Sequence, residues 1–482
     1  MSNRLFTNDT GEAILAAIKQ QNAVLARGSS GLKIDSYSDV QSIVRMGLAP
    51  AVFSVGDVIE VGRETALVAS MGEHTGITAV SFVASTGEDT FLAAMAEAGE
   101  KEYEIIYDGS VWKYDGKPII LADYGLQVTG TAAEGDTIIV VETASTINMV
   151  VMDFIEGGTT AAGNIKLHDS TKQYGMILQS EKLLYSLQFD EREAFYYSEE
   201  GLAAGTYHFK VGEHTWVAGD VNKYIQFTLT QALPAGGQLV FVQSYNATMV
   251  GGQIKSYASG SSTSVIETVT MSEGSDGTDL GTLNNSVGTA LNSCQRALLG
   301  SNRWSTGAMR QHLNSKKAAG QVWAPQTVWD RPPSWVTNTA GFMHGLDPEF
   351  IKICGDVELL TALNTVCDTS SAAGSAGTGY ETTVDKFFLP SRPEVYGAGD
   401  NNSDKGTPWQ YYSANSDLGS AGTGADKNRI KVNASNGNAG YWWLRSPYVG
   451  IGFNVRLVYP DGNIYYNIAF NSNGVAPACV VA

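Results

Sequence analysis

Apolar and polar residues alternate with a period of two over much of residues 53–146, and this alternation limits the fold more than any other feature of the sequence. Successive side chains of a β-strand point to opposite faces, so the pattern predicts half-buried strands. The stretch EIIYDGSVWKYDGKPIIL (104–121) has two Asp-Gly pairs between alternating segments. Because Asp-Gly favours the tight turns of hairpins, we predict a small all-β domain at 51–149.

A second β-rich region is predicted at 150–268. Residues 202–205 and 233–236 are two copies of a Leu-x-Ala-Gly turn, each followed by an alternating strand. Paired turn-strand units of this type suit a jelly-roll-like sandwich. The polar run at its end, rich in Ser, Gly and Thr, has the composition of a connection. We therefore place a linker at 269–283.

A long helix is predicted near the start of the sequence, at 9–27. Asp9 and Glu12 form a capping box, and one face carries a stripe of Leu15, Ile18, Asn22 and Leu25. An apolar stripe with one polar member is typical of a short coiled coil that self-associates. A helix that packs on its own domain explains the stripe equally well. We expect residues 1–50 to serve attachment and oligomerisation, with a homotrimer as the assembly.

A second, shorter helix is predicted at 35–49. Ser38 is the expected N-cap, and Gly47 is expected near the end of the helix.

Beyond residue 283 the pattern changes to helices and irregular loops. Segments 284–300 and 301–315 each predict a helix. Six of the nine tryptophans follow Trp304, amid Gly-rich loops. A domain with few regular strands needs such large side chains to fix its core. We place an α+β domain at 284–482 and predict a multidomain, mainly β chain.

The charge balance argues against two classes of partner. The sequence has 31 basic and 49 acidic residues, for a net charge of −18. Such a chain repels phosphate backbones and anionic lipid, so we expect no nucleic-acid partner and no membrane insertion. The negative charge is equally explained as a means of solubility. The first residues lack a basic segment followed by an apolar run, so no signal peptide is expected.

The cysteines and histidines do not predict a metal site. The four cysteines form no C-x-x-C pair, and the six histidines are scattered along the chain. Either one disulfide or buried free thiols fits the cysteine content. We expect no metal and no cofactor.

Four segments occur in the order NRWSTGAMRQHLNS, GFMHGLDPEF, DKFFLPSRPEVYG and YWWLRSP. Together they closely resemble a domain of unknown function that is common in Firmicutes and their phages. The resemblance covers residues 284–482 and implies a C-type-lectin-like fold. The last segment further resembles the variable region of proteins diversified by retroelements, such as phage tropism determinants. Residues 37–59 resemble N-terminal segments of phage tail-associated proteins.

Residue usage in the last segment agrees with this resemblance. In that family, mutation at adenines turns Asn codons (AAC) into NNC codons, which cannot encode Lys, Glu, Gln, Met or Trp. None of these five residue types occurs in 448–482, although the rest of the chain contains all of them. The family usually ends in Gly-Val-Arg-Pro. Here Ala476 stands in place of that Arg. Any structural salt bridge that the Arg forms in members of the family is therefore in doubt for this chain.

Pro447 is predicted to separate a scaffold from a binding surface. The adjacent Trp442 and Trp443 cannot face one side of a strand, so we expect them to fix two layers while Arg445 pairs with a carboxylate. After Pro447, only residues 454–459 alternate cleanly, with Val455, Leu457 and Tyr459 expected on one face.

Exposed Tyr and Phe side chains supply a large contact area at little entropy cost, so we interpret most of the segment after Pro447 as a binding surface; a simple core is the alternative. The candidate ligand-binding residues are Tyr448, Val449, Ile451, Phe453, Asn454, Leu457, Tyr459, Tyr465, Tyr466, Asn467, Ile468 and Phe470.

Clusters of carboxylates raise the alternative of catalysis. We expect two clusters to be solvated because they lie in a polar, turn-rich stretch: Asp190, Glu191 and Glu193, and Glu199 with Glu200. Asp347 and Glu349 instead suit a helix start. Formylglycine-generating oxidases share the lectin-like fold, but they hold copper with a nearby pair of cysteines. We expect no enzyme activity and no catalytic residue.

The resemblance implies a phage tail receptor-binding, or tropism, protein. It would be made in the bacterial cytoplasm without a signal peptide and carried in the virion tail. Its diversified C-terminal surface would bind a host-cell receptor, protein or glycan, and its N-terminal region would contact other tail proteins. The alternatives are a bacterial surface or secreted lectin-like binding protein, and a tail spike that hydrolyses glycan with the sandwich.

Overall fold

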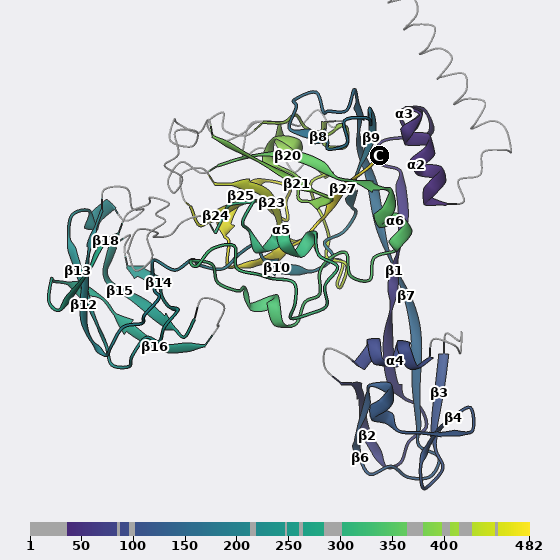
Figure 1. The fold of residues 1–482 in the computed structure, drawn as a ribbon. Coiled ribbons are helices and arrows are strands. Elements are labelled where there is room, and N and C mark those ends of the chain that lie inside the picture. Colours follow the sequence, from purple (N-terminus) through teal and green to yellow (C-terminus); the bar gives the residue numbers. More distant parts are fainter. Residues whose placement is uncertain are drawn as a thin grey trace, which may run out of the picture.

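The structure is a computed structural model of the chain. It describes residues 36–83, 87–95, 102–212, 218–245, 248–259, 264–283, 301–363, 379–397, 405–413, 427–448 and 452–482. These residues form a central body and two β domains that extend from it (Figure 1). The mainly β, multidomain organisation predicted from the sequence is confirmed. The predicted helices at 9–27 and 284–300 lie outside the described residues. No helix of the described part is long and apolar enough to cross a membrane.

The first β domain lies at the far end of a long two-stranded ribbon (Figure 1). The ribbon pairs β1 with β7 antiparallel, from Val58 opposite Val150 to Met71 opposite Ile138. The Asp-Gly hairpins are confirmed: Gly109 and Gly116 have φ of +92° and +70° in the turns on either side of β4. The elements are β1 (Val58–Met71), β2 (Ile77–Phe82), α4 (Gly87–Met95), β3 (Glu102–Tyr107), β4 (Trp112–Tyr114), β5 (Lys117–Ile119), η1 (Leu121–Tyr124), β6 (Leu126–Gly130) and β7 (Thr137–Glu156).

The second β domain is a sandwich of two four-stranded sheets. One sheet has the order β11-β14-β15-β16 and the other β17-β13-β12-β18. The two Leu-x-Ala-Gly turns pair with each other, since the backbone N–H groups of Leu202 and Leu233 each donate to the other's carbonyl. The elements are β11 (Tyr196–Ser198), β12 (Gly205–Val211), η2 (Ala218–Asp220), β13 (Tyr224–Leu229), β14 (Gly237–Tyr245), β15 (Thr248–Tyr257), β16 (Val265–Thr270), β17 (Ser272–Glu273) and β18 (Thr278–Leu283).

The prediction of a linker at 269–283 is wrong, because this segment forms β17 and β18 of the sandwich. Its polar composition hides a few regularly placed apolar residues. Met271, Leu280 and Leu283 are all buried in the sandwich core, and this burial outweighs the local preference of Ser, Gly and Asp for turns.

The central body is built from three separate parts of the chain. Its hydrophobic core contains residues from 40–61, 147–189 and 304–482. The elements are α2 (Tyr37–Arg45), α3 (Ala49–Val52), β8 (Ile165–Leu167), β9 (Tyr174–Ser180), β10 (Ser186–Gln188), α5 (Ala308–Leu313), η3 (Ser334–Thr337), α6 (Pro348–Ile353), β19 (Cys354–Gly355), β20 (Val357–Ala362), β21 (Tyr380–Asp385), β22 (Phe387–Phe388), α7 (Arg392–Tyr396), α8 (Gln410–Ser413), β23 (Trp442–Pro447), β24 (Asn454–Val458), β25 (Ile464–Ile468), β26 (Ser472–Gly474) and β27 (Ala478–Val481).

Strands from the middle of the chain complete the sheets of the C-terminal part. β9 pairs antiparallel with β27, β10 with β26, and β8 with β20. Residues 150–189, which we assigned to the sandwich, therefore pack in the central body. Both β domains are inserted into this body, one between β1 and β7 and the other after β10.

Helix α2 also packs on the central body. Val40, Ile43 and Val44 are buried on one face of the helix. The N-cap is Ser36, in a capping box with Asp39, and not the predicted Ser38. Gly47 follows the helix with φ +70°, a left-handed conformation that glycine adopts without steric cost.

Candidate functional site

Strand β23 is a fully buried scaffold, as we predict for the block 441–447, but the prediction is wrong for Tyr441, which precedes the strand and is exposed. Trp442 and Trp443 are each 0% exposed. The Trp442 indole N–H donates to the Arg429 carbonyl at 3.0 Å, and that of Trp443 donates to the Leu187 carbonyl at 2.9 Å. The two rings therefore anchor different parts of the chain on opposite faces of one strand.

The predicted carboxylate partner of Arg445 is Glu394. The two guanidinium nitrogens Nη1 and Nη2 contact the two carboxylate oxygens at 2.6 and 2.5 Å. Both side chains are buried. Glu394 also accepts from the Asn164 amide and from the backbone N–H of Ser391. A bidentate pair with its remaining lone pairs satisfied gives a buried charge a rigid and compensated setting.

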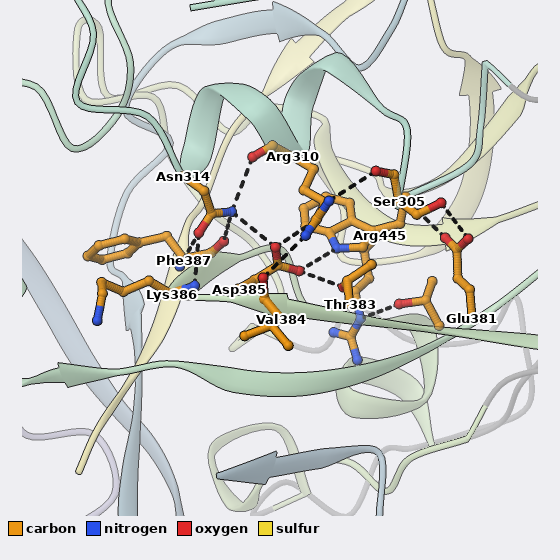
Figure 2. Close-up of polar contacts among 12 residues, drawn as sticks. Ser305, Arg310, Asn314, Glu381, Thr383, Val384, Asp385, Lys386, Phe387 and Arg445 are labelled. Carbon is orange, nitrogen blue, oxygen red and sulfur yellow. Dashed lines mark hydrogen bonds and ion pairs between the residues drawn. The ribbon is translucent and has the colours of Figure 1, made fainter. Parts of the chain in front are cut away.

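A second buried carboxylate joins two of the family-like motifs (Figure 2). Asp385 accepts from the Trp304 indole at 3.0 Å, from Arg310 Nε at 2.6 Å and from the Thr383 hydroxyl at 2.6 Å. Nearby, Glu381 accepts from the Ser305 hydroxyl at 2.6 Å. Because Asp385 is held by donors on several sides, we assign it a structural role.

A row of tyrosines in ring-to-ring contact lies on the sheet that Trp442 and Trp443 anchor. We call it the tyrosine ladder and define it as Tyr441, Tyr459, Tyr465, Tyr466 and Tyr448. Successive ring centroids lie 4.8, 5.1, 4.5 and 4.3 Å apart in this order. The ladder follows the β24–β25 hairpin, whose predicted Asp461-Gly462 turn is confirmed by a φ of +85° at Gly462.

The ladder borders a hollow of about 480 Å³ on this surface. Tyr441 and Tyr465 are the most open of its aromatic residues, each at 45% exposed. The hollow is lined by Tyr441, Phe453, Asn454, Tyr459, Tyr465, Tyr466, Asn467 and Ile468.

Seven of the twelve predicted binding residues therefore line one hollow, and Tyr448 joins them through the ladder. Phe470 lies elsewhere, under the Arg192 guanidinium, which is 3.9 Å from its ring. Val449 and Ile451 lie outside the described residues.

Leu457 does not belong to this surface, and its predicted exposure is wrong. It is 0% exposed, as are Val455 and Val458. The reason is that both faces of β24 pack in the central body: Val455 and Leu457 on one face and Val458 on the other all belong to its hydrophobic core. The alternating pattern suggested one open face. Asn454 lines the hollow but is itself only 5% exposed.

Sequence reasoning missed Tyr441 and Arg456. Tyr441 precedes Pro447, yet it is 45% exposed and packs edge-on against Tyr459. The Arg456 guanidinium lies 4.5 Å from the centre of the Tyr448 ring. The pairing of Trp442 with Val458 explains Tyr441, because it places the preceding residue beside Tyr459. That register cannot be taken from one sequence.

Tyr459 and Tyr466 of the ladder keep their phenol protons at neutral pH. Burial raises the pKa of Tyr459, and a side-chain hydrogen bond with Tyr465 raises the pKa of Tyr466. Their hydroxyl groups therefore remain hydrogen-bond donors and acceptors beside the rings.

The other predicted sites fall into two groups. Asp347 caps α6 and accepts from the Glu349 N–H at 2.8 Å, as predicted. The prediction that the cluster at 190–193 is solvated is wrong, since Glu193 is 7% exposed and burial raises the pKa of Asp190 well above its usual range. Glu199 and Glu200 are exposed.

The cysteines and the residue that replaces the family's Arg lie in the core. Cys354 and Cys479 are buried free thiols, and Cys294 and Cys367 lie outside the described residues. Ala476 is fully buried, and its carbonyl accepts from Gln179 Nε2 at 3.1 Å. Within the described ranges, no group of three or more His, Cys, Asp or Glu residues could hold a metal ion.

Comparison with known proteins gives one match. No curated protein and no solved structure matches the chain. Residues 283–482 match the model of a family described as "Domain of unknown function (DUF6273)". All four motifs of the sequence resemblance, the Arg445–Glu394 pair and the tyrosine ladder lie within the matched range. The C-terminal part of this chain, residues 283–482, is therefore a DUF6273 domain.

Proposed function

We propose that this protein is a phage tail receptor-binding protein whose C-terminal domain displays a retroelement-diversified surface. The observation that carries the proposal is the tyrosine ladder: five tyrosines in successive ring contact at a surface hollow, four of them in the segment that lacks Lys, Glu, Gln, Met and Trp. The proposal includes a C-type-lectin-like fold for residues 283–482, a place in the virion tail and no enzyme activity.

The contrast between scaffold and surface supports this function. A diversified site needs a frame that tolerates many side chains in front of it. Trp442, Trp443 and Arg445 supply such a frame, because each is fully buried and hydrogen-bonded to distant parts of the chain. Side chains of β25 in front of it are half-buried or exposed, so their replacement leaves most of the core unchanged.

The chemistry of the hollow suits recognition of a macromolecule. Tyrosine offers a large, stiff contact area with a hydrogen-bonding hydroxyl at its tip, which is why paratopes are rich in it. The lining amide of Asn467 adds an adaptable polar contact. The target is a host-cell surface receptor, protein or glycan, and a homotrimer would raise the apparent affinity of a weak single site through avidity.

Substitution of Tyr465 and Tyr466 with Ser tests the surface directly. We expect binding to host cells to fall by at least about tenfold, because aromatic anchors dominate interfaces of this kind, while the melting temperature stays within a few degrees of the wild type. Tyr224→Ser is the matched control, since Tyr224 is similarly exposed (42%) but lies on the sandwich. Loss of the folded state in the double variant, or unchanged cell binding, would contradict the proposal.

The genomic neighbourhood tests the remaining parts. A reverse transcriptase gene and an imperfect repeat of the 3′ end, differing at adenines, are expected beside this gene. Their absence would remove the diversification, and absence of tail genes would remove the virion location.

A further inference from the structure

A second candidate binding site lies where the sandwich meets the central body, on a surface separate from the tyrosine ladder. A groove of about 660 Å³ opens there. Tyr257 of β15 lines it from the sandwich, and Trp323, Arg331 and several prolines line it from the central body. Grooves between domains are a common place for small-ligand sites.

Arg331 is the unusual residue of this groove. It is 5% exposed, and its guanidinium lies 3.3 Å from the centre of the Tyr257 ring. Its Nε has no hydrogen-bond partner in the part of the chain that the structure describes, although the rest of the guanidinium contacts Tyr257. A buried donor left unused is costly, so Arg331 offers a donor for a ligand in the groove.

Glu191 supplies an acceptor on the same wall. It lines the groove and stays in place because its carboxylate accepts from the Arg192 backbone N–H at 2.8 Å. Among the described lining residues, Glu191 and Arg331 are the only charged ones, so their charges balance. An anionic ligand would meet Glu191, and a cationic one would meet Arg331. The balance favours an uncharged ligand that both donates and accepts hydrogen bonds.

Most of the remaining lining is apolar. Trp323 is half-buried and offers an aromatic ring beside Pro325, Pro332 and Pro333, and two uncharged hydroxyl residues, Ser334 and Thr337, also line the groove. An aromatic ring beside a fixed donor and a fixed acceptor matches the two kinds of surface of a pyranose, whose C–H groups form an apolar patch and whose hydroxyls donate and accept.

We propose that this junction groove binds an uncharged saccharide. Trp323 packs against a sugar ring, Arg331 Nε donates to a sugar oxygen and the Glu191 carboxylate accepts from a sugar hydroxyl. The proposal does not rest on the function of the tyrosine ladder and assigns no hydrolysis to the groove.

Saturation-transfer NMR and calorimetry on the full chain test it, with maltotriose, chitotriose and trigalacturonate as probes. We expect at least one of the two neutral trisaccharides to bind with a dissociation constant of about 1 mM or lower. Trp323→Ala and the near-isosteric Glu191→Gln should each weaken that binding by about tenfold or more. Trp112→Ala, at a half-buried Trp of the first β domain, should leave it unchanged.

Three outcomes would overturn the proposal. The first is that neither neutral trisaccharide binds at about 10 mM. The second is that only trigalacturonate binds, and the third is that Glu191→Gln binds as tightly as the wild type. A melting curve of each variant separates lost binding from lost folding, and Glu191→Gln decides if Trp323→Ala is destabilised. Tyr465→Ser should retain saccharide binding, so failure of the groove and failure of the tyrosine surface are distinguishable.

Discussion

Arg445 fixes the frame of the tyrosine surface through one carboxylate, so its replacement tests that frame. Arg445→Met should lower the free energy of unfolding by about 3–5 kcal/mol, because Glu394 would keep a buried charge without its partner. Arg445→Lys should also destabilise, since an ammonium cannot make the bidentate contact.

Urea unfolding measures both effects. Arg456→Met is the matched control: Arg456 is half-buried beside the ladder, so its loss should change stability by less than about 1 kcal/mol. Equal stabilities of Arg445→Met and the wild type would show that the pair does not hold the domain together.

Lys431 predicts a pH dependence of stability. It is 4% exposed, its ammonium donates to the Ser180 carbonyl at 2.7 Å, and burial lowers its pKa to about 7 from an ordinary value of 10.5. Between these two values the unfolded state binds a proton that the folded state does not. Stability should therefore rise from about pH 7 to pH 9 by up to about 1.4 kcal/mol per pH unit from this group.

Lys431→Met should remove that rise, whatever its effect on stability at neutral pH. Urea unfolding of both proteins at several pH values measures the difference in slope. Parallel pH profiles for the two proteins would mean that Lys431 keeps an ordinary pKa in the fold.

At the scale of single residues, the sequence predicted which type of partner a side chain needs, but not which residue supplies it. The need of Arg445 for a carboxylate follows from the cost of a buried charge. The identity of Glu394 does not, because the two residues are 51 positions apart. Tyr441 was missed for the same reason, since strand register brings it to Tyr459.

Helix α2 offers a test at the level of elements. The structure makes Ser36 the N-cap, with its hydroxyl accepting from the Asp39 N–H, whereas the sequence pattern favoured Ser38. Ser36→Ala should destabilise the protein by about 1 kcal/mol. Ser38→Ala should have almost no effect, because Ser38 is exposed inside the first turn. Thermal unfolding of the two variants compares them, and a larger loss for Ser38→Ala would place the cap where the sequence placed it.

Local patterns predicted elements well where turns and alternation agree. The hairpins around Gly109 and Gly116 are an example, since Asp-Gly determines the turn and the alternation determines the strands. The segment 269–283 is the counterexample. Its Ser, Gly and Asp favour turns, but pairing of β18 with β12 and of β17 with β13 makes it part of a sheet. Long-range pairing of this kind leaves no signature in local composition.

The whole molecule is one central body with two inserted β domains. The order of the segments along the sequence did not predict these insertions. The predicted boundary at 149/150 falls inside β7, and residues 150–189 complete the sheets of the DUF6273 domain. Met176, Ile177 and Leu178 of β9 are each 0% exposed in the shared core. Burial of one such side chain contributes about 1.5–3 kcal/mol, and a whole domain is stable by only about 5–15 kcal/mol.

This architecture predicts opposite results for two deletions. Residues 64–144 can be replaced by an Asn-Gly turn, because Arg63 and Ser145 are paired opposite each other on the ribbon and Asn-Gly suits a two-residue hairpin. The first β domain has its own core of residues 77–140, so its removal takes no side chain from the central core. We expect a cooperative melting transition of the central body and unchanged cell binding.

The fragment 283–482 should fail to fold, although it contains the entire match to DUF6273. It lacks β9, β10 and α2. The free energy that their buried residues contribute exceeds the free energy of unfolding of a typical domain. Near-ultraviolet circular dichroism and calorimetry distinguish the two proteins: the deletion should keep fixed aromatic signals and one sharp transition, and the fragment should show neither. If the fragment 283–482 folds cooperatively, the earlier strands only lie against the domain and are not needed for its stability. If the protein without residues 64–144 misfolds, the first β domain supports the central body through the ribbon.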